Sequence, residues 1–320
     1  MEISVIVLTY NSARTIDRCL DSLVAQQVAP AEIVIVDDDS TDSTLAAVEA
    51  FRSRCDVPVR VLRNGRHNIS RGRNLGMAVV RTRLVAFLDS DAWAATDWTQ
   101  KLIATFERDA ELGVIGGGID IAHASPFAEA IAVNDETIRQ LATSEELLIA
   151  GCNMAVDLTA VASERFDERW VHAEDSEFVD RVEGRCRWAA VPEARVWHES
   201  RATPRGYLRQ MYRYGMWRVR YAASTRKVRA IDYVPTAVLI AGAVLGAAVS
   251  PWLLLAVPAM SLAEAAFVIA YRRPPVRLWP LMMIGWLAKN TAWGLGVLVA
   301  IVQQVTACSQ VPPRLTRAAS

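Results

Sequence analysis

The chain has 320 residues, with 35 Lys and Arg residues against 35 Asp and Glu residues, so its formal net charge is zero. This length accommodates a globular domain of about 220 residues beside a membrane module. The sequence has no internal repeat or low-complexity tract, and its five cysteines lack the spacing of a zinc site, so we expect reduced thiols at Cys19, Cys55, Cys152, Cys186 and Cys308.

The N-terminal part of the chain predicts strands and helices in alternation. Strands are predicted at residues 2–11, 32–36, 58–62 and 83–88, and helices at residues 12–27, 44–54 and 72–80. Such alternation is typical of an α/β, Rossmann-like fold with a mostly parallel sheet and helices on both faces. Because the first strand begins at residue 2, no room remains for a signal peptide, and we expect this domain in the cytosol.

Nicotinamide-binding domains share this alternation, and Asp37 at the end of the second strand would then hold a ribose. Such domains have Gly-x-Gly-x-x-Gly after the first strand, whereas this chain has Thr9-Tyr10-Asn11-Ser12-Ala13. The sequence therefore argues against a dehydrogenase.

Two carboxylates follow the apolar strand at residues 83–88. Asp89 and Asp91 are one residue apart, so both can point the same way at the carboxyl end of the strand, where open α/β sheets bind ligands. Carboxylate oxygens suit a hard divalent cation, Mg²⁺ or Mn²⁺, which keeps coordination sites for substrate phosphates. The segment Asp89-Ser90-Asp91 can also be a simple turn, and the rest of the chain decides between these interpretations.

Six ordered motifs within residues 1–222 resemble the family 2 glycosyltransferases, which have the GT-A fold. The motifs are Thr9-Tyr10-Asn11, the segment 36–42, Arg73-Asn74-x-Gly76, Asp89-x-Asp91, the segment 151–155, and Glu174-Asp175 followed by Glu177 and Arg181. The resemblance implies donor-nucleotide binding by Thr9, Tyr10, Asn11, Asp37, Asp39, Arg73, Asn74 and Asp89, with Asp39 in place of the family's frequent Gly. It also implies an acceptor side at Gly151, Asn153 and Glu174, a metal at Asp91 and Asp89, and a catalytic base at Asp175.

Sugar transfer requires these residue types on chemical grounds as well. The leaving diphosphate needs its charge neutralised, and the attacking hydroxyl needs a base. Asp175 is expected at a helix start, where a carboxylate can also be a mere N-terminal helix charge. His198, after a predicted last strand, is a further candidate for the metal shell or a diphosphate contact, or else a partly exposed strand-end histidine. Arg73 is expected to contact donor phosphate.

Within the family, residues 209–218 resemble a subgroup that builds exopolysaccharide repeats, including the succinoglycan glycosyltransferases, and Gly116-Gly117-Gly118 supports this. The string Gln210-x-x-Arg213-Tyr214 is similar to the Gln-x-x-Arg-Trp of processive synthases. Because Tyr replaces Trp and the membrane segment is short, we do not predict processivity.

The zero net charge conceals a basic segment. Residues 200–231 contain nine Arg and Lys residues and no Asp or Glu. Arg205, Arg209 and Arg213 recur at i+4 spacing, and another face carries Leu208, Met211, Tyr212 and Gly215. This pattern predicts a helix at an anionic membrane surface. Nucleic acid would be the competing partner, but the apolar segments that follow argue for lipid.

Two apolar segments, residues 234–249 and 252–271, predict a helical hairpin broken at Ser250-Pro251. The first has 16 residues, fewer than the roughly 20 needed to span a bilayer, and a third segment at 278–302 is long enough. The alternative is a set of buried helices in a soluble domain. Arginine and lysine clusters flank the hairpin on one side, which the positive-inside rule assigns to the cytosol. We expect Glu264 and Lys289 to pair or to line a polar groove, unless each reaches water separately.

The sequence thus predicts a GT-A catalytic domain (1–222), an overlapping basic interfacial segment (200–231), an all-α transmembrane module of two to three helices (232–304) and a polar tail (305–320). The expected protein is an inverting, metal-dependent hexosyltransferase of the inner membrane with a cytosolic catalytic domain. Its donor is a nucleotide sugar and its acceptor a polyprenyl-diphosphate-linked glycan, with anionic lipids and no nucleic acid as partners. Transfer to polyprenyl phosphate is the first alternative. A non-catalytic assembly subunit is the second, and the intact carboxylates argue against it.

Overall fold

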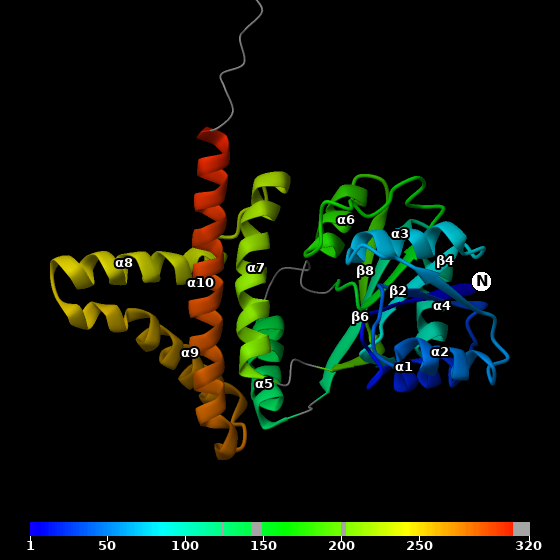
Figure 1. The fold of residues 1–320 in the computed structure, drawn as a ribbon, viewed down its shortest axis with the longest axis horizontal. Helices are drawn as coiled ribbons and strands as arrows, with labels where there is room; N and C mark the ends of the chain where they lie inside the picture. Colours follow the sequence, from blue (N-terminus) through cyan, green and yellow to red (C-terminus); the bar gives the residue numbers. More distant parts are fainter. Residues whose placement is uncertain (123–124, 142–148, 200–202, 310–320) are drawn as a thin grey trace, which may run out of the picture. The chain divides into compact units, whose positions relative to one another are not determined.

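The computed structural model describes residues 1–122, 125–141, 149–199 and 203–309 (Figure 1). The chain divides into two compact units, here called the α/β unit (Met1–Ala124 and Asp135–Ser200) and the helical unit (Ser125–Asn134 and Arg201–Ser320). The domain boundaries expected from the sequence stay predictions. The expected polar tail lies outside the described residues from residue 310 onward, as do residues 200–202 of the basic segment.

The α/β unit contains an eight-stranded sheet in the order β3-β2-β1-β4-β7-β6-β8-β5. Its strands are β1 (Ile3–Thr9), β2 (Glu32–Asp37), β3 (Val59–Arg63), β4 (Leu84–Asp89), β5 (Ala92–Ala94), β6 (Leu112–Ala122), β7 (Asn153–Asp157) and β8 (Arg187–Glu199). Strands β3, β2, β1 and β4 pair in parallel, as do β6 and β8. Strand β7 is antiparallel to β4 and β6, and β5 is antiparallel to β8. The predicted mostly parallel α/β sheet is therefore confirmed.

Helices cover both faces of this sheet. They are α1 (Ile16–Val24), α2 (Thr44–Arg52), α3 (Ile69–Val79), α4 (Trp98–Arg108) and α6 (Glu174–Val182). One buried cluster joins the sheet to α1, α2 and α4 through residues such as Leu20, Phe51 and Leu102. A second cluster joins the other face to α3 and α6 through Met77 and Phe178, and Figure 1 shows α3 and α6 opposite α1 and α2.

Helix α3 begins at Ile69, three residues before its predicted start at residue 72. The Asn68 backbone is extended, and its side chain accepts a hydrogen bond from Arg71 N, which caps the helix. The spacing of apolar residues predicted the middle of this helix but not its first turn, because that turn is polar.

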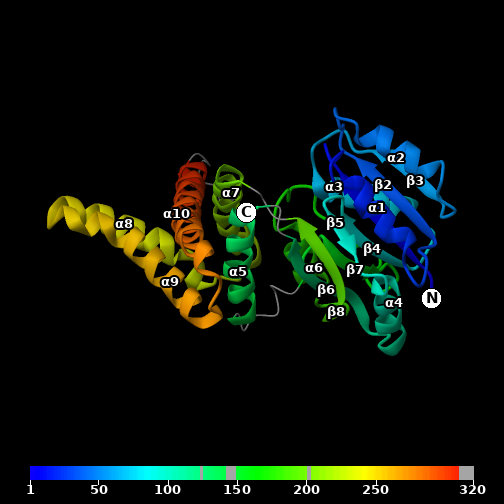
Figure 2. The same cartoon turned by 90° about the horizontal axis from the view of Figure 1, so that it is seen from below.

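The helical unit contains α5 (Pro126–Leu141) in part, α7 (Pro204–Thr225), α8 (Val234–Ala248), α9 (Ala256–Arg272) and α10 (Trp279–Ser309), with 3₁₀ turns η2 (Ala230–Tyr233), η3 (Pro251–Leu255) and η4 (Val276–Leu278). Helices α7 and α10 lie along each other (Figures 1 and 2). A Cβ on Gly215 would lie 2.3 Å from Trp293 O, and a Cβ on Gly296 would lie 2.1 Å from Tyr212 O. Glycine at both positions therefore permits this close approach.

Helix α7 is amphipathic, as the sequence predicts. Its exposed positions include Arg205, Leu208, Arg209 and Arg213, and its buried positions include Tyr207, Met211, Gly215 and Val219. The buried side contacts Ala288 and Ala292 of α10, so protein covers it. Leu208 is exposed and does not belong to that side, contrary to the prediction. The side that faces α10 is formed by Tyr207, Met211, Gly215 and Val219, which recur every four residues.

Among the described residues, three helices are long and apolar enough to cross a membrane by length and composition: Ala230–Ala248, Pro251–Arg272 and Val276–Thr306. The break at Ser250-Pro251 is confirmed, and η2 lengthens the first segment to 19 residues. Glu264 accepts a hydrogen bond from Asn290 Nδ2, and Lys289 Nζ lies 4.3 Å from the centroid of the Trp286 ring. The pairing of Glu264 with Lys289 stays a prediction.

Candidate active site

The carboxyl ends of β1, β2 and β4 lie side by side and carry polar side chains. In the register of these strands, Thr9 is opposite Asp37, and Leu8 is opposite Asp89. Thr9 Oγ1, Asp37 Oδ1 and Asp89 Oδ1 are buried and have no hydrogen-bond partner among the described residues. Because buried polar atoms are normally paired, three spare atoms at one sheet edge indicate a place where a ligand completes the bonding.

Asp89, Asp91 and His198 form a cluster at this edge. The pairing of β5 with β8 sets His198 opposite Ala92, next to Asp91. His198 Nε2 lies 3.2 Å from Asp91 Oδ1 and 3.8 Å from Asp89 Oδ2. Burial lowers the pKa of His198, but hydrogen bonds to the two carboxylates and their charges outweigh it and raise the pKa to about 10. The protonated His198 ring therefore places a positive charge beside the negative charges of Asp89 and Asp91.

Cys152 belongs to the same cluster, although the sequence pattern indicated only a reduced filler. Its Sγ, an Asp89 oxygen and a His198 nitrogen lie within 4.8 Å of one another. Antiparallel pairing of β7 with β4 brings Cys152 beside the end of β4. Burial raises the pKa of the Cys152 thiol well above its ordinary value, and the charges of Asp89, Asp175 and Asp91 raise it further. All three carboxylates therefore lie within electrostatic range of one thiol. The position of Cys152 inside the Gly151–Ala155 motif was the available signal.

Asp175 is the second residue of α6, at the helix start that the sequence predicts. Its Oδ2 accepts a hydrogen bond from Gly151 N at 2.9 Å, and its Oδ1 accepts one from Ser176 N at 2.7 Å. The side chain is half-buried. Two backbone amides thus orient the carboxylate, Ser176 Oγ also donates to Oδ1 at 3.5 Å, and Oδ2 retains a lone pair that can accept a proton.

Arg73 and Glu174 form a buried ion pair beside this carboxylate. Arg73 Nη1 lies 2.5 Å from Glu174 Oε1, and the two side chains are 1% and 8% exposed. The guanidinium lies over the rings of Phe87 and Phe166. A Cβ on Gly151 would lie 2.0 Å from Arg73 Nη2, so the loop packs directly on the guanidinium. Arg73 Nε is buried without a hydrogen-bond partner among the described residues, and the predicted contact of Arg73 with donor phosphate stays a prediction.

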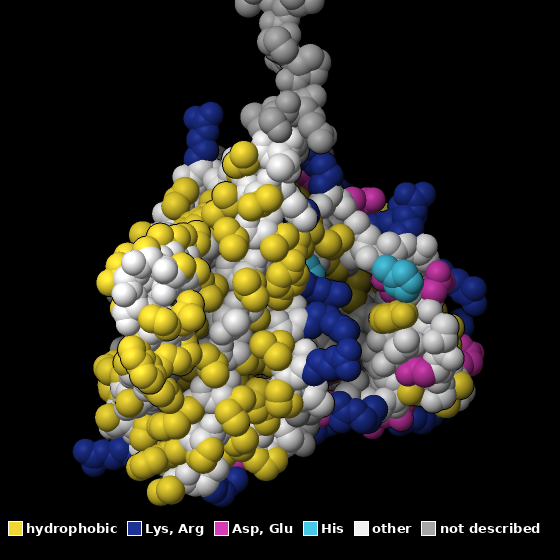
Figure 3. All heavy atoms as spheres, turned by 60° about the vertical axis from the view of Figure 1, so that its left-hand side comes forward, with side chains coloured by type: hydrophobic (Ala, Val, Ile, Leu, Met, Phe, Trp, Pro, Cys, Tyr) yellow, Lys and Arg dark blue, Asp and Glu magenta, His cyan; other side chains and the backbone are white. Residues whose placement is uncertain are grey.

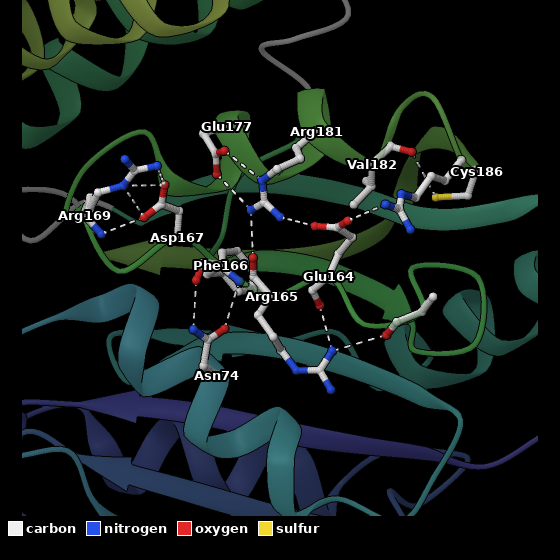
Figure 4. Close-up of polar contacts among 12 residues, drawn as sticks. Asn74, Glu164, Arg165, Phe166, Asp167, Arg169, Glu177, Arg181, Val182 and Cys186 are labelled. Atoms are coloured by element: carbon white, nitrogen blue, oxygen red, sulfur yellow. Dashed lines mark hydrogen bonds and ion pairs between the residues drawn. The ribbon is translucent and has the colours of Figure 1, made fainter.

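Asn74 and Asn153 use their amide groups inside the protein. Asn74 Nδ2 donates to Phe166 O and Asn74 Oδ1 accepts from Phe166 N, both at 2.8 Å (Figure 4). Asn153 Oδ1 accepts from Trp98 Nε1, and Asn153 Nδ2 donates to backbone carbonyls of β6 and β8. Their expected substrate contacts stay predictions, since these amides already hold the sheet and the neighbouring loop together.

An ion-pair cluster fixes α6 to the segment that follows β7 (Figure 4). Arg181 of α6 binds Glu177 on the same helix and Glu164 in that segment. Its guanidinium also donates to Arg165 O at 2.7 Å. Because α3 is tied to the same segment through Asn74, this cluster helps to set the position of the helix that carries Asp175.

Residues 4–153 match the model of the family described as glycosyl transferase family 2. Residues 4–153 are a family 2 glycosyltransferase domain. The resemblance inferred from the sequence is therefore confirmed for this domain.

Relatives of the family 2 domain include proteins of the exopolysaccharide type. An uncharacterized glycosyltransferase of Nostoc sp. is 30% identical over 161 residues, which cover 50% of this chain and 45% of the relative. The succinoglycan biosynthesis protein ExoO of Rhizobium meliloti is 38% identical over 103 residues, which cover 32% of this chain and 29% of the relative. The chain thus matches less than half the length of these relatives.

Solved structures share the fold. The mannosyltransferase PcManGT of Pyrobaculum calidifontis, in complex with GDP-Man and Mn²⁺, has a TM-score of 0.61 and 18% identity over 95% of this chain and 88% of that chain. Staphylococcus aureus TarS in complex with UDP has a TM-score of 0.50 and 17% identity over 95% of this chain and 92% of that chain. These similarities confirm the GT-A fold expected for the family 2 domain.

In the family 2 domain, the first two donor motifs lie on adjoining loops. Asn11 Oδ1 accepts from Thr41 N, and Asn11 N donates to Ser40 Oγ, so Asn11 joins the loops after β1 and β2. Tyr10 is 52% exposed beside them. Asp39 has φ +60°, a left-handed conformation that suits Gly and that Asp tolerates better than most residues. This backbone explains how Asp39 can occupy the position where the family frequently has Gly.

Proposed function

We propose that the protein is an inverting, metal-dependent glycosyltransferase that moves a sugar from a nucleotide donor to a membrane-held glycan linked to polyprenyl diphosphate. The observation that carries the proposal is the grouping of Asp89, Asp91 and His198 with Asp175 around the Gly151-Cys152 loop, at the end of the residues that match family 2. One side of this group offers ligands for a cation and a diphosphate, and the other offers a base.

The donor side fits a divalent cation. Asp89 Oδ1 is a buried acceptor without a partner among the described residues, Asp91 would supply a further O ligand, and His198 would supply an N ligand once a cation displaced its proton. A bound Mg²⁺ or Mn²⁺ would neutralise charge on the leaving diphosphate. Thr9 and Asp37, at the adjoining strand ends, have spare polar atoms for the nucleoside. The Mn²⁺ and GDP-Man in the PcManGT structure support this assignment.

The acceptor side supplies the base. Gly151 N and Ser176 N hold the Asp175 carboxylate, and the remaining lone pair of its Oδ2 can take the proton from an attacking hydroxyl. Attack on the anomeric carbon from the side opposite the diphosphate inverts its configuration. The buried pair of Arg73 and Glu174 keeps the Gly151 loop and the start of α6 in register for this step.

The membrane-held acceptor is supported by the helical unit. Three of its helices are long and apolar enough to cross a membrane, and apolar side chains cover a broad face of the helices (Figure 3). The similarity to ExoO, a succinoglycan biosynthesis protein, supports an acceptor from polysaccharide assembly. Under this proposal, the flanking basic residues keep the catalytic domain at the cytosolic face of the inner membrane, where soluble donors are available.

A transfer assay with the full chain in membranes tests the proposal. Labelled nucleotide sugars would be offered with extracted polyprenyl-linked lipids, with Asp91→Asn as the matched control. We expect label in the lipid fraction, loss of transfer in excess chelator, recovery with Mn²⁺ or Mg²⁺, and an anomeric configuration opposite to that of the donor. Transfer that is unaffected by the chelator, or that retains configuration, would contradict the proposal. A product with one sugar on polyprenyl phosphate would reassign the acceptor.

A further inference from the structure

We infer that only the hairpin of α8 and α9 enters the hydrocarbon core of the bilayer, whereas α10 stays with α7 at the membrane surface. The inference deepens the proposed membrane function by naming the part of the chain that lipid covers. It predicts that the end of α10 lies on the same side of the membrane as α7, although α10 has the length and composition of a spanning helix.

The directions of the helices prevent all of them from crossing a bilayer together. In Figures 1 and 2, α8 runs away from α10 and crosswise to it, and α9 returns toward the first turn of α10. Helix α7 instead runs alongside α10. A bilayer that α10 crosses would therefore leave α8 flat, and a bilayer that the hairpin enters would leave α10 and α7 along its surface.

The charges of α7 decide against a spanning α10. Exposed Arg205, Arg209 and Arg213 lie in the first half of α7, whose buried Tyr207 and Met211 cluster with Ala288 and Ala292 near the middle of α10. If α10 crossed the bilayer, several of these guanidinium groups would lie at hydrocarbon depth, which is costly for arginine. At the surface, the same groups can contact lipid phosphates.

The apolar character of α10 has another explanation inside the protein. Along α10, 44% of its most apolar window is buried, against 22% and 28% for the two hairpin segments. Gly285 packs on Ile131 of α5, and Val297 packs on Val219 of α7. Helix α10 is therefore the central helix of this unit, and protein covers one side of it, while Ile284, Leu295 and Val302 on its other side are exposed and can face the membrane surface.

The hairpin has the properties of a bilayer insert. Its exposed side chains are apolar along both helices, whereas a helix that lies flat at an interface needs a polar face. The tip is apolar as well, with Trp252 79% and Val249 73% exposed. Glu264 lies in the half of α9 that reaches α10, where it binds Asn290. Thr236 and Leu239 of α8 and Ser261 of α9 contact α10, so the part of the hairpin between Leu239 and Ser261 is the part free to enter the bilayer.

Charged groups mark where the hairpin leaves the protein. At its start, Asp232 pairs with Arg218 and Arg229. At its end, Arg277 forms a bidentate ion pair with Glu129 of α5, with N–O distances of 3.0 and 2.9 Å. Both ends of the hairpin are therefore fixed on the protein, as a loop that enters and leaves the bilayer on one side requires.

Thiol labelling of the full chain in cells tests the topology. Thr306→Cys places a probe at an exposed position near the end of α10, and Ser53→Cys places a matched probe in the α/β unit. A membrane-impermeant maleimide would be applied before and after permeabilisation, and the labelled cysteines identified by mass spectrometry. We expect both probes to react only after permeabilisation, in protein that sediments with membranes.

Reaction at Thr306→Cys in intact cells, with Ser53→Cys still protected, would overturn the inference because α10 would then cross the bilayer. If Thr306→Cys failed to react on either side, α10 would be embedded, and the inference would fail as well. Recovery of the protein in the soluble fraction would also overturn the inference, because the hairpin would then not be inserted in a bilayer. Labelling needs no substrate, so a failed transfer assay and a failed topology remain distinguishable.

Discussion

The two sides of the candidate active site differ in how far their polar groups are paired, although Arg73 Nε beside the base is also buried without a partner among the described residues. At the strand ends, Thr9, Asp37 and Asp89 each keep a buried polar atom without a partner among the described residues. Across the Gly151 loop, the amide of Asn153 donates hydrogen bonds to backbone carbonyls, and the carboxylate of Glu174 forms an ion pair with Arg73. The unpaired groups indicate where the donor binds, and the paired groups indicate what holds the base in place.

Asp91→Asn should have the largest effect, because it replaces a charged ligand beside the diphosphate with a neutral amide. We expect transfer to be abolished and donor binding to weaken, measured as turnover and as nucleotide dissociation constant. Asp56→Asn, at an exposed turn before β3, is the matched control and should behave as wild type. Full transfer by Asp91→Asn would end the assignment of a metal to this side.

Asp175→Asn should separate chemistry from binding, since the amide keeps the shape of the side chain but cannot take a proton. Turnover should fall by at least about a hundredfold, the usual scale of a general base, while the nucleotide dissociation constant stays within a few-fold. Asp180→Asn on the same helix is the control. Collapse of donor binding with surviving turnover at saturation would move Asp175 to the donor side.

Arg73→Met should act on stability before it acts on binding. It leaves Glu174 buried without its ion-pair partner, a change that typically costs about 3–5 kcal/mol of unfolding free energy. Denaturant unfolding would measure this loss, and Arg73→Met/Glu174→Leu should recover part of it. Arg71→Met, two residues earlier on α3 and more exposed, is the control. Unchanged stability together with weakened donor binding would instead support the predicted contact of Arg73 with donor phosphate.

His198 should make the stability of the metal-free protein depend on pH. Its pKa is raised from 6.5 to about 10 in the folded protein. The stabilisation from the protonated ring is therefore fully present below about pH 6.5 and is lost as the pH rises toward 10. Thermal unfolding between pH 7 and 9 should show this decline, and His198→Gln should reduce it. An equal decline in both proteins would assign it to other groups.

Cys152→Ser should have the smallest effect on transfer supported by Mg²⁺ or Mn²⁺, since these ions prefer oxygen ligands. It should weaken the binding of Cd²⁺, a thiophilic ion, measured through the ultraviolet absorption of the thiolate complex. Cys55→Ser, outside the cluster, should leave that absorption unchanged. If Cys152→Ser kept the full signal, the thiol would not face the cation site.

The local part of the site was predictable from the sequence. Asp89 and Asp91 follow a strand whose apolar run identifies it, and Asp175 begins a helix with an acidic first turn. His198 was a candidate because it follows a predicted last strand; in the structure it lies within β8, and pairing with β5 brings it to Asp91. These predictions needed only strand ends and the parallel order of β1, β2 and β4.

The remaining contacts depend on pairings between distant segments, which periodicity does not encode. Arg73 meets Glu174 across 101 positions of the chain, and Cys152 reaches Asp89 only because β7 inserts antiparallel between β4 and β6. In the helical unit, hydropathy showed three apolar segments but not that protein covers more of α10 than of the two hairpin helices. A helix buried in protein and a helix buried in lipid have similar composition, so only packing separates them.

Anomalous scattering from Mn²⁺ in crystals of the full chain grown with a nucleoside diphosphate would locate the cation directly. We expect a peak at about 2.0–2.2 Å from oxygens of Asp89 and Asp91, with the diphosphate on the side of Thr9 and Asp37. Asp175 should remain on Gly151 N, outside the coordination shell. A peak elsewhere, with His198 still between the two carboxylates, would contradict the division of the site into a donor side and a base side.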